Sequence, residues 1–315
     1  MEPLRIVFAG TPGFAVPSLR ALLEGPDSVA GVLTQPDRPA GRGQRLRPSP
    51  VKELALEAGL PVAQPGSLRS EEERAPLAEW APDLLVVVAY GLILPRAVLE
   101  GPPLGCLNVH ASLLPAYRGA APIQRAILDG CAETGISVME MEPGLDCGPV
   151  LLQHRRAIGP RETAGELHDA LAELGAEALG EAVAGLKAGT LQPEPQDPER
   201  ATYAPKVNKE EARLNWSRPA DVLERAVRAF NPWPVAHTCR GESPLRVWSA
   251  RRGAGGPGSP PGTVFYGEGE VVVACGEGTG LVLEEVQPAG RKRMAAPDAV
   301  RGGYLVPGEL LGDGC

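Results

Sequence analysis

The chain has 315 residues, of which 43% are hydrophobic, and this length is sufficient for two packed domains. Its formal net charge of -8 excludes a uniformly basic protein that coats nucleic acid. No run reaches the roughly 18 apolar residues that a membrane helix needs, and no basic N-terminal stretch leads into an apolar one. We therefore expect a soluble, cytoplasmic protein with no membrane partner.

Charge is unevenly distributed along the sequence. Residues 35–52 carry a net charge of +4 and residues 200–252 a net charge of +6, whereas residues 53–199 carry -13. Two basic regions in an acidic chain favour a polyanionic partner that contacts both. For either region taken alone, a solvated surface is the preferred interpretation. The six cysteines form no C-x-x-C pair and accompany no histidine cluster, so we expect neither a metal site nor a disulfide framework.

Short apolar strands alternate with amphipathic helices in the first 189 residues. The run DLLVVVAYG at 83–91 is typical of a central parallel strand covered on both faces. The alternation predicts an α/β fold with a doubly wound, mostly parallel sheet. The expected strands are 4–10, 29–35, 83–91, 105–111 and the pair 135–142 and 148–158, and the expected helices are 12–25, 50–59, 122–130 and 163–189.

The pattern changes after residue 189. Residues 190–208 are rich in proline and polar side chains and lack periodicity, so we interpret them as a linker. One helix at 220–230 and several short β-rich runs separated by glycine and proline then predict a small C-terminal β-barrel. We therefore expect a catalytic domain at 1–189, a linker at 190–208 and a barrel domain at 209–315.

Asn108 and His110 lie two residues apart at the end of the apolar run 105–111. Residues i and i+2 of a strand point to the same side, so the amide and the imidazole face one small volume. In an open α/β sheet, ligands bind at the carboxyl ends of the strands. The alternative is a histidine that only completes its hydrogen bonds at the end of a strand.

Asp146 lies between Gly144 and Gly148, where glycines allow close backbone approach. A carboxylate beside His110 would favour the protonated imidazole. With Asn108, this set supplies two donors for an oxyanion and a pair that handles a proton, which suits direct attack of a substrate nucleophile on a carbonyl. Two alternatives compete: Asp146 as an ordinary turn residue, and a dinucleotide site at the incomplete glycine pattern AGTPG (9–13).

Seven stretches of the sequence resemble the methionyl-tRNA formyltransferases. They are FAGTPGFAVPSL (8–19), QPDRPAGRGQRLRPSPVK (35–52), VAYGLILP (88–95), NVHASLLPAYRGAAPIQRAI (108–127), GLDCGP (144–149), YAPKVNKEEARLNW (203–216) and FNPWP (230–234). The resemblance implies a Rossmann-like formyltransferase domain followed by an OB-like barrel. It also implies transfer of a formyl group from 10-formyltetrahydrofolate to the α-amino group of methionyl-initiator tRNA. We expect no metal, because the candidate site has no ligand set of the kind that zinc uses.

The resemblance assigns roles to individual residues. Asn108 and His110 would hold the formyl oxygen, Asp146 would orient His110 and take part in proton transfer, and Phe14 would contact the methionyl group. The residues expected to bind the folate co-substrate are Ser112, Leu113, Leu114 and Pro115, with Tyr90 and Leu92 from the stretch 89–94.

The resemblance also places initiator methionyl-tRNA on the two basic regions of a monomer. Arg42 would enter the acceptor stem. The tRNA phosphate backbone would be contacted by Lys206, Lys209 and residues 291–293. A sugar-nucleotide amine formyltransferase would share the catalytic set, but it has no need of the basic stretch 35–52. A glycinamide ribonucleotide formyltransferase would end near the linker. A nucleic-acid-binding module would leave Asn108, His110 and Asp146 without a purpose.

Overall fold

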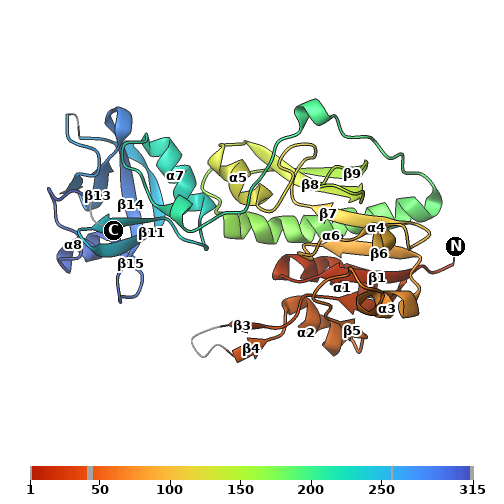
Figure 1. The fold of residues 1–315 in the computed structure, drawn as a ribbon. Coiled ribbons are helices and arrows are strands. Elements are labelled where there is room, and N and C mark those ends of the chain that lie inside the picture. The colour runs from red at the N-terminus through yellow and green to blue at the C-terminus, as the bar shows by residue number, and fades with distance from the viewer. Residues whose placement is uncertain (1, 41–44, 257, 313–315) are drawn as a thin grey trace. The chain divides into compact units, whose positions relative to one another are not determined.

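The computed structural model describes residues 2–40, 45–256 and 258–312 (Figure 1). The described chain forms two compact units. Unit 1 comprises residues 1–122, 133–157 and 168–204, and unit 2 comprises residues 123–132, 158–167 and 205–315. The segments 123–132 and 158–167, which the sequence places within 1–189, thus make their contacts in unit 2. The division of the chain at 189 and 208 remains a prediction.

Unit 1 is built on one seven-stranded sheet in the order β5-β2-β1-β6-β7-β8-β9. Neighbouring strands from β5 to β7 are parallel, and β8 and β9 continue the sheet antiparallel. The predicted mostly parallel sheet and the predicted strand pair at its end are therefore confirmed. The strands are β1 (Arg5–Gly10), β2 (Ser28–Leu33), β5 (Val62–Ala63), β6 (Leu84–Val88), β7 (Cys106–His110), β8 (Glu133–Glu140) and β9 (Val150–Ala157).

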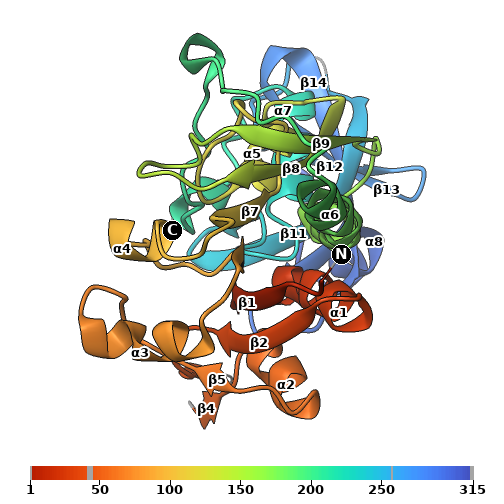
Figure 2. The ribbon, with the colours of Figure 1, turned by 90° about the vertical axis from the view of Figure 1, so that its right-hand side faces the viewer.

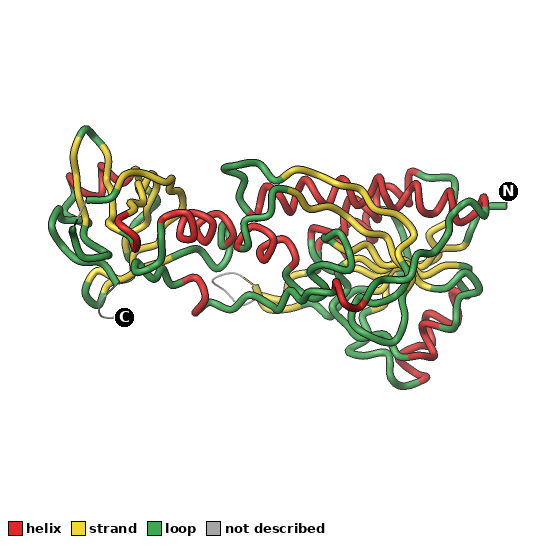
Figure 3. Tube along the Cα trace, turned by 90° about the horizontal axis from the view of Figure 1, so that it is seen from above, coloured by secondary structure: helices red, strands yellow, loops and turns green. Residues whose placement is uncertain are grey.

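Helices cover both faces of this sheet. Figure 2 shows α1 and α6 on one side and α3 and α4 on the other, and the view from above in Figure 3 shows the strands as one layer between helices. A small hairpin of β3 (Arg38–Ala40) and β4 (Arg45–Arg47) lies outside the sheet. The helices are α1 (Val16–Glu24), α2 (Pro50–Glu57), α3 (Glu71–Trp80), α4 (Arg96–Leu99) and α6 (Ala164–Ala188), whose part from His168 onward belongs to unit 1.

The apolar runs explain why the central strands need cover on two faces. All five residues of β6 are buried, and so are Ile6, Val7, Phe8 and Ala9 of β1. Because strand residues alternate between faces, Val7 and Ala9 join one cluster with Leu77 and Trp80 of α3. Trp80 packs directly on Gly31 of β2, where a Cβ atom would lie only 2.4 Å from the indole.

Part of the expected linker is integral to unit 1. Glu194 forms a bridge with Val150 at the start of β9, and Tyr203 forms a bridge with Arg118. We call residues 194–204 the strap. The sequence interpretation of this part as a connecting segment missed these pairings, because the strap has no periodic apolar pattern and is ordered by backbone hydrogen bonds instead.

Unit 2 contains an antiparallel sheet in the order β10-β11-β14-β13-β12, with β15 paired to β14. Its core includes Trp216, Val247, Val273 and Leu283. The predicted C-terminal domain of antiparallel strands is confirmed; within the described residues, β10 and β12 are the ends of the strand order and no pair joins them. The elements are α5 (Pro122–Leu128), which enters unit 2 from Ile123, α7 (Ala220–Ala229), β10 (His237–Arg240), β11 (Ser243–Ala254), β12 (Val264–Gly267), β13 (Glu270–Ala274), β14 (Thr279–Pro288), β15 (Met294–Ala295) and α8 (Ala296–Arg301).

Two further features bear on the expectations from sequence. Across the part of the chain that the structure describes, no helix combines the length and apolar character required to cross a membrane. Cys239 is disulfide-bonded, whereas Cys106, Cys131, Cys147 and Cys275 are free. The sequence, which argued only against a disulfide framework, did not predict this bond at Cys239.

Candidate active site

The candidate site is centred on β7, whose last residues carry two buried polar side chains. Asn108 is 8% exposed and His110 is 7% exposed. Val109 between them faces the opposite side of the sheet, where it packs against Gly175 of α6. The strand alternation predicted from the sequence thus places Asn108 and His110 together on the face away from α6. No hydrogen bond is recorded between the Asn108 amide and the described residues, so its donors are available to a ligand.

The hydrogen bond of His110 determines which ring nitrogen faces Asp146. Its Nε2 lies 2.9 Å from the Tyr117 carbonyl oxygen, which can only accept, so Nε2 carries a proton. Its Nδ1 lies 3.7 Å from Oδ2 of Asp146, too far for a direct hydrogen bond but within the range of an ion pair. The protonated imidazole would therefore present its Nδ1–H toward Asp146 and the space beside it.

Asp146 is held on the loop between β8 and β9. Its backbone is left-handed, with φ +49°, and its Oδ2 accepts a hydrogen bond of 2.8 Å from the Gly119 amide. Gly148 is required by close approach, since a Cβ atom there would lie 2.0 Å from the Glu140 carbonyl oxygen. The glycine noted in the sequence beside this aspartate therefore has a steric function in the loop.

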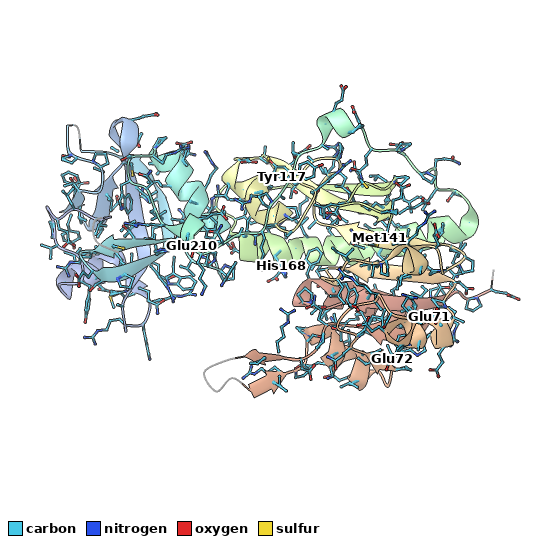
Figure 4. The ribbon with its side chains drawn as sticks, in the orientation of Figure 1. Glu71, Glu72, Tyr117, Met141, His168 and Glu210 are labelled. Carbon is cyan, nitrogen blue, oxygen red and sulfur yellow. The ribbon has the colours of Figure 1, made fainter. Side chains whose placement is uncertain are left out.

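The segment Tyr117–Gly119 touches both members of the His–Asp pair. Tyr117, labelled in Figure 4, offers its carbonyl to His110, and Gly119 offers its amide to Asp146. Tyr117 and Gly119 both have positive φ angles, +59° and +114°. The strap supports this segment, because Thr202 Oγ1 accepts from the Tyr117 amide and Ala204 exchanges backbone hydrogen bonds with Arg118 and Ala120.

The loop 89–94 lies at the end of β6. Thr11 Oγ1 and Gln35 Nε2 both donate to the Tyr90 carbonyl, at 2.9 and 3.1 Å, and this ties the loop to the ends of β1 and β2. The Tyr90 side chain is 1% exposed, and its hydroxyl has no partner within the described chain. Burial raises the pKa of that hydroxyl, so it is a neutral donor. Leu92 is partly buried against the apolar cluster that contains Tyr90, Val7 and Ala9.

Three other residues expected to bind folate share a cleft. Leu113, Leu114 and Pro115 line a cleft of about 570 Å³ together with β9 and the strap. The Ser112 hydroxyl is buried and donates to the Ala116 carbonyl at 2.6 Å, so it stabilises its own turn. Tyr90 and Leu92 do not line this cleft. Phe14 is 7% exposed and packs edge-on against His168, with ring centroids 5.3 Å apart.

Sequence reasoning missed two residues that are structurally central to the site. Arg118 is 7% exposed, and its guanidinium donates twice to Oε1 of Gln196 in the strap, at 3.0 and 2.7 Å. Gln196 in turn donates to the carbonyls of Asp146 and Gly148. The only sequence signal was the position of Arg118 in the motif PAYRG, and Gln196 had none because it stood in the presumed linker.

Only part of the expected tRNA surface can be described. Arg42 lies outside the described residues. Lys206 and Lys209 are exposed in unit 2, and Lys209 lines a cleft of about 690 Å³ with Trp233, His237 and Arg246. Arg291 stacks over Tyr304 and Arg293 over Trp248, while Lys292 is exposed.

Metal ligation finds no support in the described chain. Within residues 2–40, 45–256 and 258–312, no three His, Cys, Asp or Glu side chains gather in a group that could hold a metal ion. The arrangement at β7 can instead offer hydrogen-bond donors from Asn108 and His110 and a carboxylate from Asp146.

Comparison with known proteins decides the family. Residues 4–183 match the family model for formyl transferase, and residues 206–303 match the formyl transferase C-terminal domain. A methionyl-tRNA formyltransferase of Pseudomonas fluorescens is 58% identical over 299 residues, which cover 94% of this chain and 93% of the relative. The chain belongs to the methionyl-tRNA formyltransferase family. As a family member it is a formyltransferase, and the resemblance found in the sequence is confirmed.

Solved structures show how widely the fold of this formyltransferase is shared. An N-formyltransferase from Helicobacter canadensis, in complex with folinic acid and dTDP-3-aminofucose, superposes with a TM-score of 0.67 at 17% identity, covering 90% of this chain and 99% of its own. Methionyl-tRNA formyltransferase from Clostridium thermocellum superposes with a TM-score of 0.56 at 14% identity, covering 90% and 98%. At such identities the likeness concerns the fold alone.

Proposed function

We propose that this formyltransferase transfers the formyl group of 10-formyltetrahydrofolate to the α-amino group of methionyl-initiator tRNA in the cytoplasm. The observation that supports this best is the geometry at β7. Asn108 and His110 lie on one face, and Asp146 stands 3.7 Å from the His110 Nδ1. Full-length relatives above 50% identity are named methionyl-tRNA formyltransferases, whereas the sugar-modifying neighbour is 17% identical.

The β7 residues would act on the formyl carbonyl. The Asn108 amide and the Nδ1–H of protonated His110 donate to the formyl oxygen as it gains negative charge. His110 can orient only this edge toward the substrate, because its Nε2 proton is engaged by the Tyr117 carbonyl. Preorganised donors of this kind stabilise charge without reorganisation at the moment of reaction.

Asp146 and His110 would manage the protons. An α-amino group has an ordinary pKa of about 7.7–8.0, so a useful neutral fraction exists at pH 7. Because protonated His110 has no free nitrogen lone pair, the amine loses one proton to the Asp146 carboxylate as its nitrogen bonds to the formyl carbon. The pair returns one proton to the departing folate nitrogen as the old carbon–nitrogen bond breaks, so its charge is restored.

We propose that the loop 89–94 surrounds the pterin ring of the folate. The buried Tyr90 hydroxyl is left without a partner among the described residues, and Leu92 supplies apolar surface. Leu113, Leu114 and Pro115 would extend the folate site along their cleft, and the buried Ser112 hydroxyl would hold their turn in place.

The direct test is to incubate the full chain with 10-formyltetrahydrofolate and methionine charged on initiator or elongator tRNA. We expect N-formylmethionine on the initiator tRNA. A parallel incubation replaces tRNA with a dTDP-linked amino sugar. Formylation of the sugar without formylation of methionyl-tRNA would overturn the proposal in favour of the sugar-nucleotide alternative.

Arg42, Lys206 and Lys209 are proposed to bind the tRNA. An arginine at the end of the acceptor stem would position the reactive amine and select the initiator. We expect Arg42→Ala to lower kcat/KM for tRNA and the preference for initiator over elongator, with folate binding little changed. If both values match those of the unmodified enzyme at fixed salt, Arg42 is an ordinary surface charge.

A further inference from the structure

We propose that Gln196, in the strap, is a positioning residue that holds Asp146 against His110. The inference rests on the proposed function for its kinetic consequence, but its structural basis is independent of the substrate. All of the residues concerned lie in unit 1. None of the sequence motifs that mark the catalytic set includes Gln196.

The Gln196 side chain uses both ends of its amide. Its Oε1 accepts from Nε and Nη2 of Arg118, at 3.0 and 2.7 Å. Its Nε2 donates to the backbone carbonyls of Asp146 and Gly148, at 2.9 and 2.8 Å. An amide has two donors and one acceptor oxygen, so every group is engaged at once. An aliphatic or acidic side chain of the same length cannot reproduce that set.

These contacts close a ring around the His–Asp pair. His110 bonds to the Tyr117 carbonyl, Tyr117 precedes Arg118, and Arg118 bonds to Gln196. Gln196 holds the backbone of Asp146, whose carboxylate returns to the Gly119 amide. Arg118 therefore lies between Tyr117 and Gly119, the residues that contact His110 and Asp146. Gln196 is the side chain in this ring that holds the Asp146 loop through its backbone carbonyls.

The Asp146 loop needs such an external support. Asp146 has φ +49°, a left-handed conformation that few residues other than glycine adopt, although aspartate tolerates it better than most. The carboxylate is 3.7 Å from His110 Nδ1, so no direct hydrogen bond between the pair fixes this separation. The position of the carboxylate instead depends on the Gly119 amide at one end and on Gln196 at the backbone.

Gln196→Ala should lower kcat with little change in KM for methionyl-tRNA. A misplacement of about 1 Å in a catalytic group costs about 10²-fold in rate. Gln196→Glu provides a second variant that keeps the acceptor for the buried Arg118 and removes both donors to the loop, so we expect it to fold and still to lose kcat. Glu199→Ala is the matched control, because Glu199 lies in the strap but is exposed, does not line the 570 Å³ cleft and makes no side-chain hydrogen bond to the described residues.

A double-mutant cycle separates positioning from general structural damage. If Gln196 acts through Asp146, adding Gln196→Ala to an Asp146→Ala enzyme should cost nothing further. An equal loss in both backgrounds would overturn the proposal, as would a loss confined to KM or unchanged turnover in Gln196→Ala.

A spectroscopic arm does not depend on the substrate at all. The chain has four histidines, so the ¹⁵N signals of the His110 ring can be resolved in the full-length protein. We expect Gln196→Ala to shift the His110 Nδ1 signal and Glu199→Ala to leave it in place. An unmoved His110 signal would overturn the positioning role, whereas a shifted signal in a protein that fails to formylate methionyl-tRNA would contradict only the proposed function.

Discussion

His110 illustrates how one backbone atom can decide the chemistry of a side chain. Because the Tyr117 carbonyl accepts the hydrogen bond from Nε2–H, only the Nδ1 edge of the ring is left for Asp146 and the substrate.

We predict that Asn108→Ala, His110→Ala and Asp146→Ala each reduce the rate of formyl transfer by about 10²–10³-fold while the protein stays folded. Single-turnover kinetics at saturating folate would measure this. The three losses should combine to less than their product, because the groups act as a unit; near-normal turnover in all three variants would refute the site.

The close packing at Gly148 leads to a second prediction about a single residue. A methyl group there would lie 2.0 Å from the Glu140 carbonyl oxygen, which belongs to a strand and cannot move freely. We expect Gly148→Ala to lower the free energy of unfolding by about 1–3 kcal/mol and to reduce turnover by displacing Asp146. Gly180→Ala in α6 is the matched control, since nothing lies within 4 Å of that position. It should stabilise the helix by about 0.5–1 kcal/mol. Equal denaturation midpoints for both variants would contradict the steric argument.

At the scale of elements, local sequence patterns predicted the individual strands and helices. The buried strands β6 and β7 and the long helix α6 follow from apolar runs and periodicity, and the i and i+2 spacing placed Asn108 and His110 on one face. The strap could not be predicted in the same way. It is ordered by long-range backbone pairs to Arg118 and Val150, and neither composition nor spacing encodes such pairs. For that reason, we expect that cutting the chain near Gln196 would disturb the segment Tyr117–Gly119 that contacts His110 and Asp146.

Helix α3 offers a prediction on pH. Glu73 accepts from the Ser67 hydroxyl and from the Ser70 amide at the start of this helix, and these hydrogen bonds lower its pKa to about 2. A carboxyl with a lowered pKa in the folded state stabilises the protein above its ordinary pKa of about 4.5, and that stability is lost as the pH falls toward 2.

Glu73→Gln tests this sign. The melting temperature of the variant should lie below that of the unmodified protein at pH 6, and the difference should shrink as the pH falls below about 4.5. A melting difference that is constant from pH 6 to pH 3 would show that the charge of Glu73 does not contribute through these hydrogen bonds.

The distribution of charge over the whole molecule separates arginines that hold the fold together from those available to a polyanion. In residues 200–252 several arginines are already paired, including Arg225 with Asp221, Arg228 with Glu224 and Arg251 with Glu270. Arg246 is exposed, has no ion pair recorded with any described residue, and lines the cleft that contains Lys209 and Trp233. Net charge alone could not make this distinction, because a paired and an unpaired arginine count equally in the sequence.

Arg246 and Arg251 lie on the same strand, β11, and provide a matched test of tRNA binding. We predict that Arg246→Ala weakens tRNA binding and lowers the slope of log affinity against log salt by about 0.9, the value for one lost phosphate contact on a duplex. Arg251→Ala should leave the slope unchanged, because Glu270 already neutralises that side chain. Turnover at saturating tRNA should be normal in both variants, since neither residue lies near β7 in the sequence or belongs to unit 1. Filter binding of initiator methionyl-tRNA over a range of salt concentrations measures the slopes. If the two variants change the slope equally, ion pairing within unit 2 does not determine which arginines contact the tRNA. The proposed contact at the Lys209 cleft is then wrong.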